Sequence, residues 1–233
     1  MNSVIVIISS QTEWTIVRSY LKPQKVGETP YGEWFDGSRP EWNRVLQVRF
    51  VQGGLGKISA AGSVQYAINQ WNPELVVNLG TCGGFKGFIE KGEIVLVEKT
   101  IVYDIIDNME VADSGIAYYT THIDLSWLNE EHLGNVRKTL IVSADHDLHP
   151  PEIPDLYRKF GAVAGDWESG AIAWVAHINK KKVLILRGVT DLVDEHGGDV
   201  YGNDSLYQRA AEEIMKIVIG RLIVFLRKHF EHY

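Results

Sequence analysis

Short runs of apolar residues recur along the chain, and most are continuous rather than alternating with polar positions. β-Branched residues dominate these runs, which is typical of β-strands. A continuous run indicates a strand that is buried on both faces, as in a parallel sheet with helices on either side. The runs that we predict to be strands are residues 4–8, 45–51, 75–77, 94–97, 140–142 and 183–186.

Segments with the 3.6-residue period of amphipathic helices lie between these runs. One covers residues 58–71 and ends at an Asn-Pro pair, which terminates helices. A second covers 167–178, with Asp166 as its predicted N-cap. A third covers 206–230. Its predicted buried face consists of Ile214, Ile217, Val218, Arg221, Leu222 and Phe225.

This alternation of strands and helices predicts the α/β class, with a mixed, mostly parallel central sheet in an α/β/α sandwich. The 233-residue chain has no linker, internal repeat or low-complexity tract, so we expect one domain over residues 1–233. Residues 104–135 are polar and irregular and carry Trp and Tyr. We predict an excursion or flexible loop there.

Composition narrows the classes of partner. A net charge of −7 argues against nucleic-acid binding, because no basic stripe exists to displace counterions. No run approaches the roughly 20 apolar residues of a membrane helix, and the N-terminus lacks the basic region of a signal peptide. The single cysteine, Cys82, cannot form an internal disulfide, which suits a reducing cytosol. We therefore expect a cytoplasmic protein that binds neither nucleic acid nor membrane.

Polar residues follow three of the predicted strands, at the edge of an α/β sheet where ligands bind. After the first strand, a helical pattern begins near Trp14 and places Glu13 in its first turn. Interaction with the helix dipole, worth ~0.3–1 kcal/mol, would by itself explain an acid there. Position alone therefore favours a structural role for Glu13.

The second strand end is rich in glycine, with three in the five residues 80–84. Glycine permits positive φ and close approach of the backbone to a ligand. Thr81 and the backbone near Gly83 are therefore candidates to face a sugar or a water molecule, with a simple tight turn as the alternative. The spacing matches neither a dinucleotide loop nor a P-loop, so we predict no phosphate cradle.

The third strand end runs from Arg187 through Asp194 and includes Asp191. Burial raises the pKa of a carboxyl group, so Asp191 is a candidate to carry a proton near neutral pH. Glu168 lies just upstream, at the start of a predicted helix. With Glu13, these acids are expected to meet at one edge of the sheet, and paired acids suit the cleavage of a glycosidic bond.

Six motifs occur in order along nearly the whole chain, and together they resemble the purine nucleoside phosphorylase and nucleosidase superfamily. The resemblance is greatest to its 5'-methylthioadenosine/S-adenosylhomocysteine nucleosidases. It implies the nucleoside phosphorylase-like fold, no cofactor, and a homodimer in which the partner closes part of the substituent pocket. The motifs are I-x-S-x-x-x-E (7–13), G-G-L-G-K (53–57), N-x-G-T-x-G-G (78–84), I-V-S-A-D (141–145), D-W-E-S-G-A-I-A (166–173) and R-G-V-T-D (187–191).

The resemblance implies a role for each matching residue. Glu13 corresponds to the glutamate that activates the attacking water, and Thr81 to a hydroxyl residue beside that water. Glu168 corresponds to the carboxylate that binds the ribose 2'- and 3'-hydroxyls. Asp191 corresponds to the acid that holds or protonates N7 of the departing purine, and Arg187 to an arginine that organises the site.

The choice between water and phosphate as the nucleophile depends on two arginines that bind phosphate in the phosphorylases. Phosphorylases of the superfamily carry one phosphate-binding arginine near an early G-D-P turn and another just before the G-T-x-G-G loop. Here the early loop, residues 9–13, reads SSQTE, and position 78 is Asn. We therefore predict a hydrolase that uses water to release adenine from a 5'-modified adenosine.

Two positions, Asp147 and Trp167, depart from the family pattern. Asp147 occupies the place of an aromatic residue that lies over the purine, so either the purine stacks elsewhere or the base differs. Trp167 stands where a methionine usually packs on the sugar, and Ile58 follows a loop that borders the site. Residues 145–149 include His and Asp, which are metal ligands, but no distant partner is evident, so we predict no metal.

Three alternatives remain open. A phosphorylase of purine nucleosides or uridine would depend on phosphate, and a hydrolase of futalosine-type nucleosides would fit the departure at Asp147. The third is a nucleoside-binding module without turnover, against which the three acids argue. No motif defines the pocket for the 5'-substituent, so a methylthio, homocysteinyl, deoxy or larger group remains possible.

Overall fold

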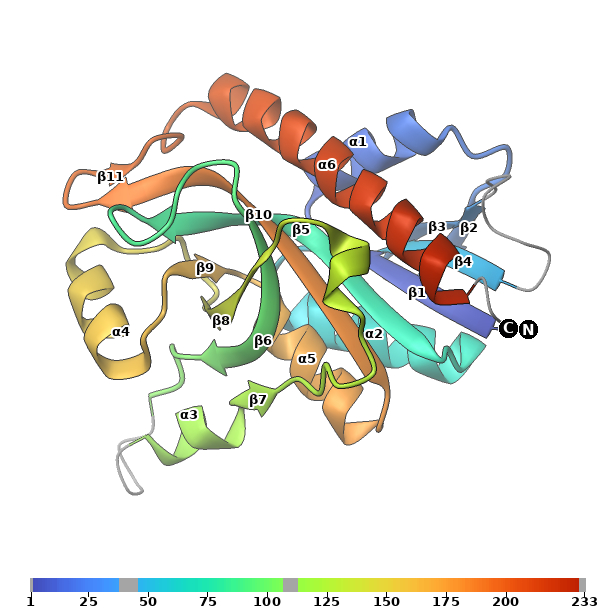
Figure 1. The fold of residues 1–233 in the computed structure, drawn as a ribbon, viewed down its shortest axis with the longest axis horizontal. Helices are drawn as coiled ribbons and strands as arrows, with labels where there is room; N and C mark the ends of the chain where they lie inside the picture. The colour runs from blue at the N-terminus through green and yellow to red at the C-terminus, as the bar shows by residue number, and fades with distance from the viewer. Residues whose placement is uncertain (1, 38–45, 107–112, 231–233) are drawn as a thin grey trace.

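An eleven-stranded mixed sheet forms the centre of the computed structural model, which describes residues 2–37, 46–106 and 113–230 (Figure 1). The strands are β1 (Asn2–Ile8), β2 (Gly27–Thr29), β3 (Gly32–Gly37), β4 (Leu46–Gln52), β5 (Leu75–Phe85), β6 (Ile94–Val102), β7 (Thr121–His122), β8 (Arg137–Ser143), β9 (Ala164–Asp166), β10 (Lys182–Asp194) and β11 (Gly197–Gly198). The α-helices are α1 (Gln11–Leu21), α2 (Gly56–Trp71), α3 (Ser114–Tyr118), α4 (Ile153–Phe160), α5 (Ser169–Ile178) and α6 (Asp204–Phe230). Short 3-10 turns occupy η1 (Glu130–Leu133) and η2 (Pro150–Glu152).

The three longest ladders of this sheet join β1 to β4, β5 to β10, and β6 to β8, and all three are parallel. Antiparallel pairs add β3 and β2 beyond β4. At the other end, β10 pairs with both β5 and β6, while β9 joins β5 to β8. The strands β5, β9, β8, β6 and β10 thus close into a small barrel. The predicted mixed, mostly parallel sheet is confirmed.

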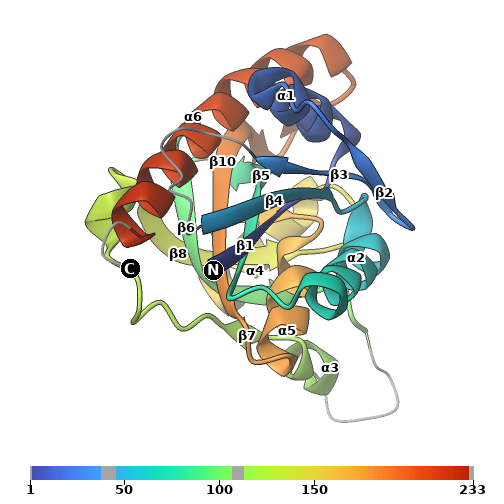
Figure 2. The ribbon, with the colours of Figure 1, turned by 90° about the vertical axis from the view of Figure 1, so that its right-hand side faces the viewer.

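Helices cover both faces of the open part of the sheet, as the end-on view in Figure 2 shows. Successive side chains of a strand point to opposite faces. On β1, Val4 and Val6 therefore pack in the core beneath α1 and α6, whereas Ile5 and Ile7 pack in the core beneath α2 and α5. Burial on both faces explains why this strand is a continuous apolar run, and the predicted α/β/α sandwich is confirmed.

Several predicted boundaries were wrong. The helix expected at 167–178 begins at Ser169, because Asp166 belongs to β9. The N-cap is Glu168 and not the predicted Asp166, although Asp166 Oδ1 accepts a hydrogen bond from the backbone N–H of Ser169 at 3.2 Å. On α6, Ile217 is 42% exposed and lies off the buried face. The strands predicted at 75–77 and 183–186 were too short, because β5 and β10 continue through their polar, glycine-containing ends.

The predicted excursion at 104–135 contains α3, β7 and η1, so it is more ordered than a loop. Residues 107–112 of this segment, and position 45 of a predicted strand, lie outside the described residues. None of the helices in the described ranges is both long and apolar enough to span a lipid bilayer.

Candidate active site

A cavity of about 640 Å³ opens beyond the carboxyl ends of β5 and β10, within the size range of small-ligand pockets. Residues from β5, β9, β10 and the loops after β1 and β8 line it, together with the start of α6. Seven of the eight candidate residues are brought together in its wall. They are Glu13, Thr81, Gly83, Asp147, Trp167, Glu168 and Asp191.

Glu13 is fixed by contacts with both α1 and β5. Ser10 is the N-cap of α1, and its hydroxyl accepts a hydrogen bond from the backbone N–H of Glu13 at 3.1 Å. The Glu13 side chain turns inward, and its Oε1 accepts hydrogen bonds from the Thr81 backbone N–H (2.7 Å) and hydroxyl (2.9 Å). At 3% exposure, Glu13 is a buried, oriented carboxylate and does more than stabilise the first turn of a helix.

Arg187 lies behind the cavity wall and does not line it. Its guanidinium pairs with Asp166 (Nε to Oδ2, 2.6 Å) and lies 3.8 Å from a Glu168 oxygen. Its Nη2 also donates to Asn78 Oδ1 at 2.7 Å. Gly80 makes room for it, since a Cβ there would lie 1.8 Å from Nη1. Arg187 therefore holds the acids of the wall in place from inside the protein.

Glu168 links this internal network to the opposite rim of the cavity. Its Oε1 accepts a hydrogen bond at 3.0 Å from the backbone N–H of Gly56, at the start of α2. Burial raises the pKa of Glu168 to about 8, although the nearby Arg187 guanidinium acts in the opposite direction. A carboxyl group in this position can exchange hydrogen bonds with the hydroxyl groups of a sugar.

Asp191 reaches the cavity because β10 contains a bulge. The register of β10 against β5 shifts between Val189 and Asp191, so Thr190 is an extra residue. A bulge of this kind re-aims the side chain that follows it. The Thr190 hydroxyl donates to Asp191 Oδ1 at 3.0 Å. Burial nevertheless raises the pKa of Asp191 to about 6, with added repulsion from Asp199 and Asp147.

Gly83 and Asp147 shape the part of the cavity near Asp191. A Cβ at Gly83 would lie 3.0 Å from Leu148 Cδ1, so the glycine leaves room for the leucine side chain that packs beneath the cavity. Asp147 is exposed at the mouth, where its Oδ1 accepts a hydrogen bond from the Trp167 indole N–H at 3.3 Å. The two residues that depart from the family pattern thus contact each other.

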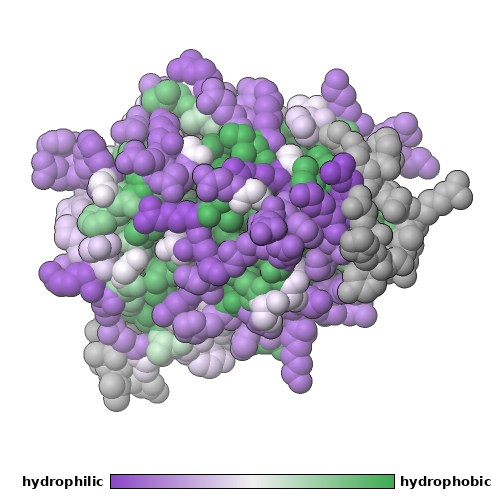
Figure 3. Space-filling view, in the orientation of Figure 1, coloured by the Kyte–Doolittle hydropathy of each residue, from purple (hydrophilic) through white to green (hydrophobic). Residues whose placement is uncertain are grey.

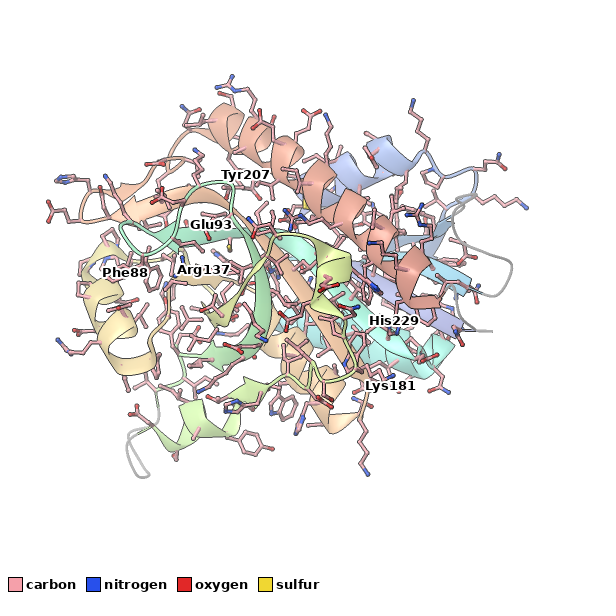
Figure 4. All side chains as sticks on the ribbon, in the orientation of Figure 1. Phe88, Glu93, Arg137, Lys181, Tyr207 and His229 are labelled. Carbon is pink, nitrogen blue, oxygen red and sulfur yellow. The ribbon has the colours of Figure 1, made fainter. Side chains whose placement is uncertain are left out.

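Three tyrosines of the wall were not predicted from the sequence: Tyr103, Tyr201 and Tyr207. Tyr207 lies on the first turns of α6 (Figure 4), close enough to the hydroxyl groups of Thr81 and Ser10 for both to oppose the effect of burial on its pKa. Burial raises its pKa to about 12, so its hydroxyl stays protonated. Its helical spacing to Ala211 and Ile214 was the available signal, because it places Tyr207 on the buried side.

Ile58, which the sequence placed after a loop at the site, is 87% exposed and does not line the cavity, whereas Leu55 does. The thiol of Cys82 is buried, which raises its pKa, so it remains neutral and unreactive. His196 lies in the turn between β10 and β11, and its side chain is 83% exposed.

Negative charge dominates the cavity. Glu13, Asp147, Asp166, Glu168, Asp191 and Asp204 all contribute to its lining. Neither lysine nor arginine lines it within the described ranges, and Arg187 is already paired with Asp166. Such a surface repels a free anion and accepts hydrogen bonds from a neutral or cationic ligand. Across the same ranges, no cluster of His, Cys, Asp or Glu has the arrangement of a metal site.

The sequence and the fold also match known proteins. A sequence model of the phosphorylase superfamily matches residues 4–223. A 5'-methylthioadenosine/S-adenosylhomocysteine nucleosidase of Bacillus velezensis is 26% identical over 227 residues, which cover 92% of this chain and 96% of the relative.

Two solved structures are similar in fold. The first is the MTA/SAH nucleosidase of Streptococcus pneumoniae in complex with 8-aminoadenine (TM-score 0.79, 19% identity, 97% of this chain and 99% of that one). The second is a futalosine hydrolase mutant of Helicobacter pylori (TM-score 0.79, 14% identity, 95% and 99%). Because the superfamily match extends over nearly the whole sequence, the chain belongs to the phosphorylase superfamily.

Proposed function

We propose that the protein hydrolyses the N-ribosyl bond of a 5'-modified purine nucleoside, methylthioadenosine or S-adenosylhomocysteine, and releases adenine. One observation carries this proposal. A buried acid with a pKa of about 6, Asp191, shares a cation-free cavity wall with a buried, hydrogen-bonded carboxylate, Glu13. The first can donate a proton to a departing base, and the second can accept a proton from water.

In this mechanism Asp191 donates its proton to N7 of the purine as the bond between C1' and the base breaks. The sugar then has oxocarbenium character, which the surrounding carboxylates stabilise. Glu13, oriented by Thr81, takes a proton from water as the water oxygen bonds to C1'. Glu168 holds the ribose hydroxyls, and Arg187 keeps Glu168 in place.

The lining of the cavity favours water over phosphate as the nucleophile. A phosphorylase site needs cations that neutralise phosphate, and the described wall offers six carboxyl groups instead. The distant relatives named as nucleosidases support the same choice. The futalosine hydrolase neighbour shares only the fold, so a futalosine-type nucleoside is a comparison substrate.

The experiment is to incubate the purified protein with methylthioadenosine, S-adenosylhomocysteine, adenosine, inosine, uridine and a futalosine-type nucleoside, each with and without phosphate. Free base and sugar are then separated by chromatography. We expect adenine from the 5'-thio nucleosides at a rate that does not depend on phosphate. Release of base in phosphate alone, with ribose 1-phosphate as co-product, would contradict the proposal.

We also infer that the protein is a cytoplasmic homodimer. Apolar side chains are exposed beside the cavity mouth and along the neighbouring helices: Leu55 (60%), Ile58 (87%), Tyr118 (64%) and Ile178 (50%). Tyr118 packs against Trp174 of α5, and α5 packs against α2. The face in Figure 3, by contrast, is mostly hydrophilic. A second copy seated on α2 and α5 would bury these side chains and cover the cavity near Leu55.

Replacing Ile58 by Glu is therefore expected to shift the protein from dimer to monomer in light scattering and to raise KM for a 5'-thio nucleoside. The reason is that dimerisation would bury the unpaired charge of the glutamate, which costs free energy of association. Ile217→Glu on α6, where the wild-type side chain is 42% exposed, is the matched control and should stay dimeric. A wild-type protein that is monomeric at micromolar concentration would refute the inference.

A further inference from the structure

Tyr201 joins two walls of the cavity. It lies between β11 and α6, lines the cavity, and is 40% exposed. Its hydroxyl donates a hydrogen bond at 3.0 Å to the carbonyl oxygen of Leu148, which belongs to the segment after β8. This bond spans 53 positions of sequence and holds the loop before α6 against the opposite side of the cavity.

The Tyr201 ring lies directly beside the carboxyl group of Asp191. A Cβ built on Gly198 would be 2.5 Å from Tyr201 Cε1 and 2.6 Å from Asp191 Oδ2. The edge of the ring and the carboxyl oxygen therefore border the same small space, the one that a side chain at position 198 would occupy. A base must reach Asp191 to be protonated, so it must lie next to this ring.

The other tyrosines and the tryptophan of the wall have polar contacts of their own. Tyr207 lies near Thr81, at the Glu13 end of the cavity. The Tyr103 hydroxyl donates to Glu152 at 3.3 Å, and the Trp167 indole donates to Asp147. Asp147 itself offers a carboxylate and no ring. Tyr201 differs from them in its ring, because Tyr201 Cε1 and Cδ1 and Asp191 Oδ2 are the atoms closest to a Cβ built on Gly198.

We propose that Tyr201 forms the base-binding wall of the site: its ring packs on the purine, and its bond to the Leu148 carbonyl keeps the ring in place. The inference rests on the proposed function, because the purine is the leaving group of that reaction. Tyr201 thus replaces the aromatic contact that Asp147 cannot make. Tyr201 is then a base-binding residue: stacking adds to the affinity for the base, and the contacts of the sugar do not involve it.

Binding of free adenine, measured by isothermal titration calorimetry, tests this without turnover. Stacking of a base on an aromatic ring is worth roughly 1–3 kcal/mol on substitution by alanine. Tyr201→Ala should therefore weaken adenine binding by about 10-fold or more and raise KM more than it lowers kcat. Tyr201→Phe keeps the ring and should lose less than about 5-fold. The double variant Asp147→Phe/Tyr201→Ala should regain much of the affinity, because the ring returns from the opposite wall.

Tyr157→Ala is the matched control, since Tyr157 is 42% exposed on α4 and does not line the cavity. Tyr201→Ala that binds adenine as tightly as the wild type, or a double variant no better than Tyr201→Ala, would overturn the inference and leave the proposed function standing. A wild-type protein that neither binds adenine nor releases it from any nucleoside would overturn both.

Discussion

Replacing Asp191 by Asn is expected to lower kcat for nucleoside hydrolysis by about 10²–10⁴-fold. The amide has nearly the shape of the acid and can still accept the hydrogen bond that Thr190 donates at 3.0 Å. It cannot give a proton to the departing base. The measurement is the initial rate of adenine release from methylthioadenosine, with a thermal melt to verify folding. A kcat within a few-fold of the wild type would exclude Asp191 as the proton donor.

The pH dependence gives a second test of Asp191. The group must be protonated to act as an acid, and its pKa in the free protein is about 6. The wild-type kcat/KM should therefore fall as pH rises above about 6 and approach a tenfold loss per pH unit. Residual activity of Asp191→Asn should lack this alkaline fall. An equal fall in both proteins would assign the ionisation to another group.

The same substitution should stabilise the fold at neutral and alkaline pH. Burial raises the pKa of Asp191 from its ordinary value of 3.8 to about 6, so the folded protein binds the proton more tightly than the unfolded chain. The proton on Asp191 therefore stabilises the folded protein. This stabilisation is fully present below about pH 4 and is lost as pH rises through about 6. Asparagine has no charge to desolvate. We expect Asp191→Asn to exceed the wild type by roughly 1–3 kcal/mol in urea unfolding at pH 8, and to equal it near pH 4.

The layers of the fold and the acids of the site could be predicted because both follow from the local order of apolar and polar residues along the chain. Continuous β-branched runs such as residues 4–8 report burial on both faces, and the structure buries this run between two helical layers. Polar residues that follow such runs lie at one edge of a parallel sheet by geometry alone. This is why Glu13, Glu168 and Asp191 converge although 178 positions separate the first from the last.

Features that depend on register could not be predicted in this way. The bulge at Thr190 sets the direction of the Asp191 side chain, and the pattern of apolar residues in the sequence does not indicate this bulge. The resemblance placed Arg187 among the residues that organise the site, and the sequence did not indicate that Gly80, on the paired strand, leaves room for its guanidinium behind the cavity wall. Tyr201 reaches the site through a loop whose path is set by its bond to Leu148, a contact that sequence spacing does not encode.

Replacing Glu13 by Gln is expected to lower kcat by about 10²–10⁴-fold while binding of free adenine stays within a few-fold of the wild type. The Gln carbonyl can still accept the hydrogen bonds from Thr81, at 2.7 and 2.9 Å in the wild type, so the wall keeps its shape. What is lost is the negative charge near the sugar and the ability to accept a proton from water. Single-turnover release of adenine and calorimetric binding of adenine measure the two quantities separately.

Glu33→Gln is the matched control, because Glu33 carries a carboxylate that contacts α1 from outside the cavity through Arg18. It should keep full activity. The residual activity of Glu13→Gln should still fall above about pH 6, because Asp191 remains in place, whereas that of Asp191→Asn should not. This contrast assigns the two acids to opposite ends of the bond that breaks. If Glu13→Gln instead lost adenine binding in proportion to kcat, Glu13 would be a binding residue, and the proton of the attacking water would have to leave through another group.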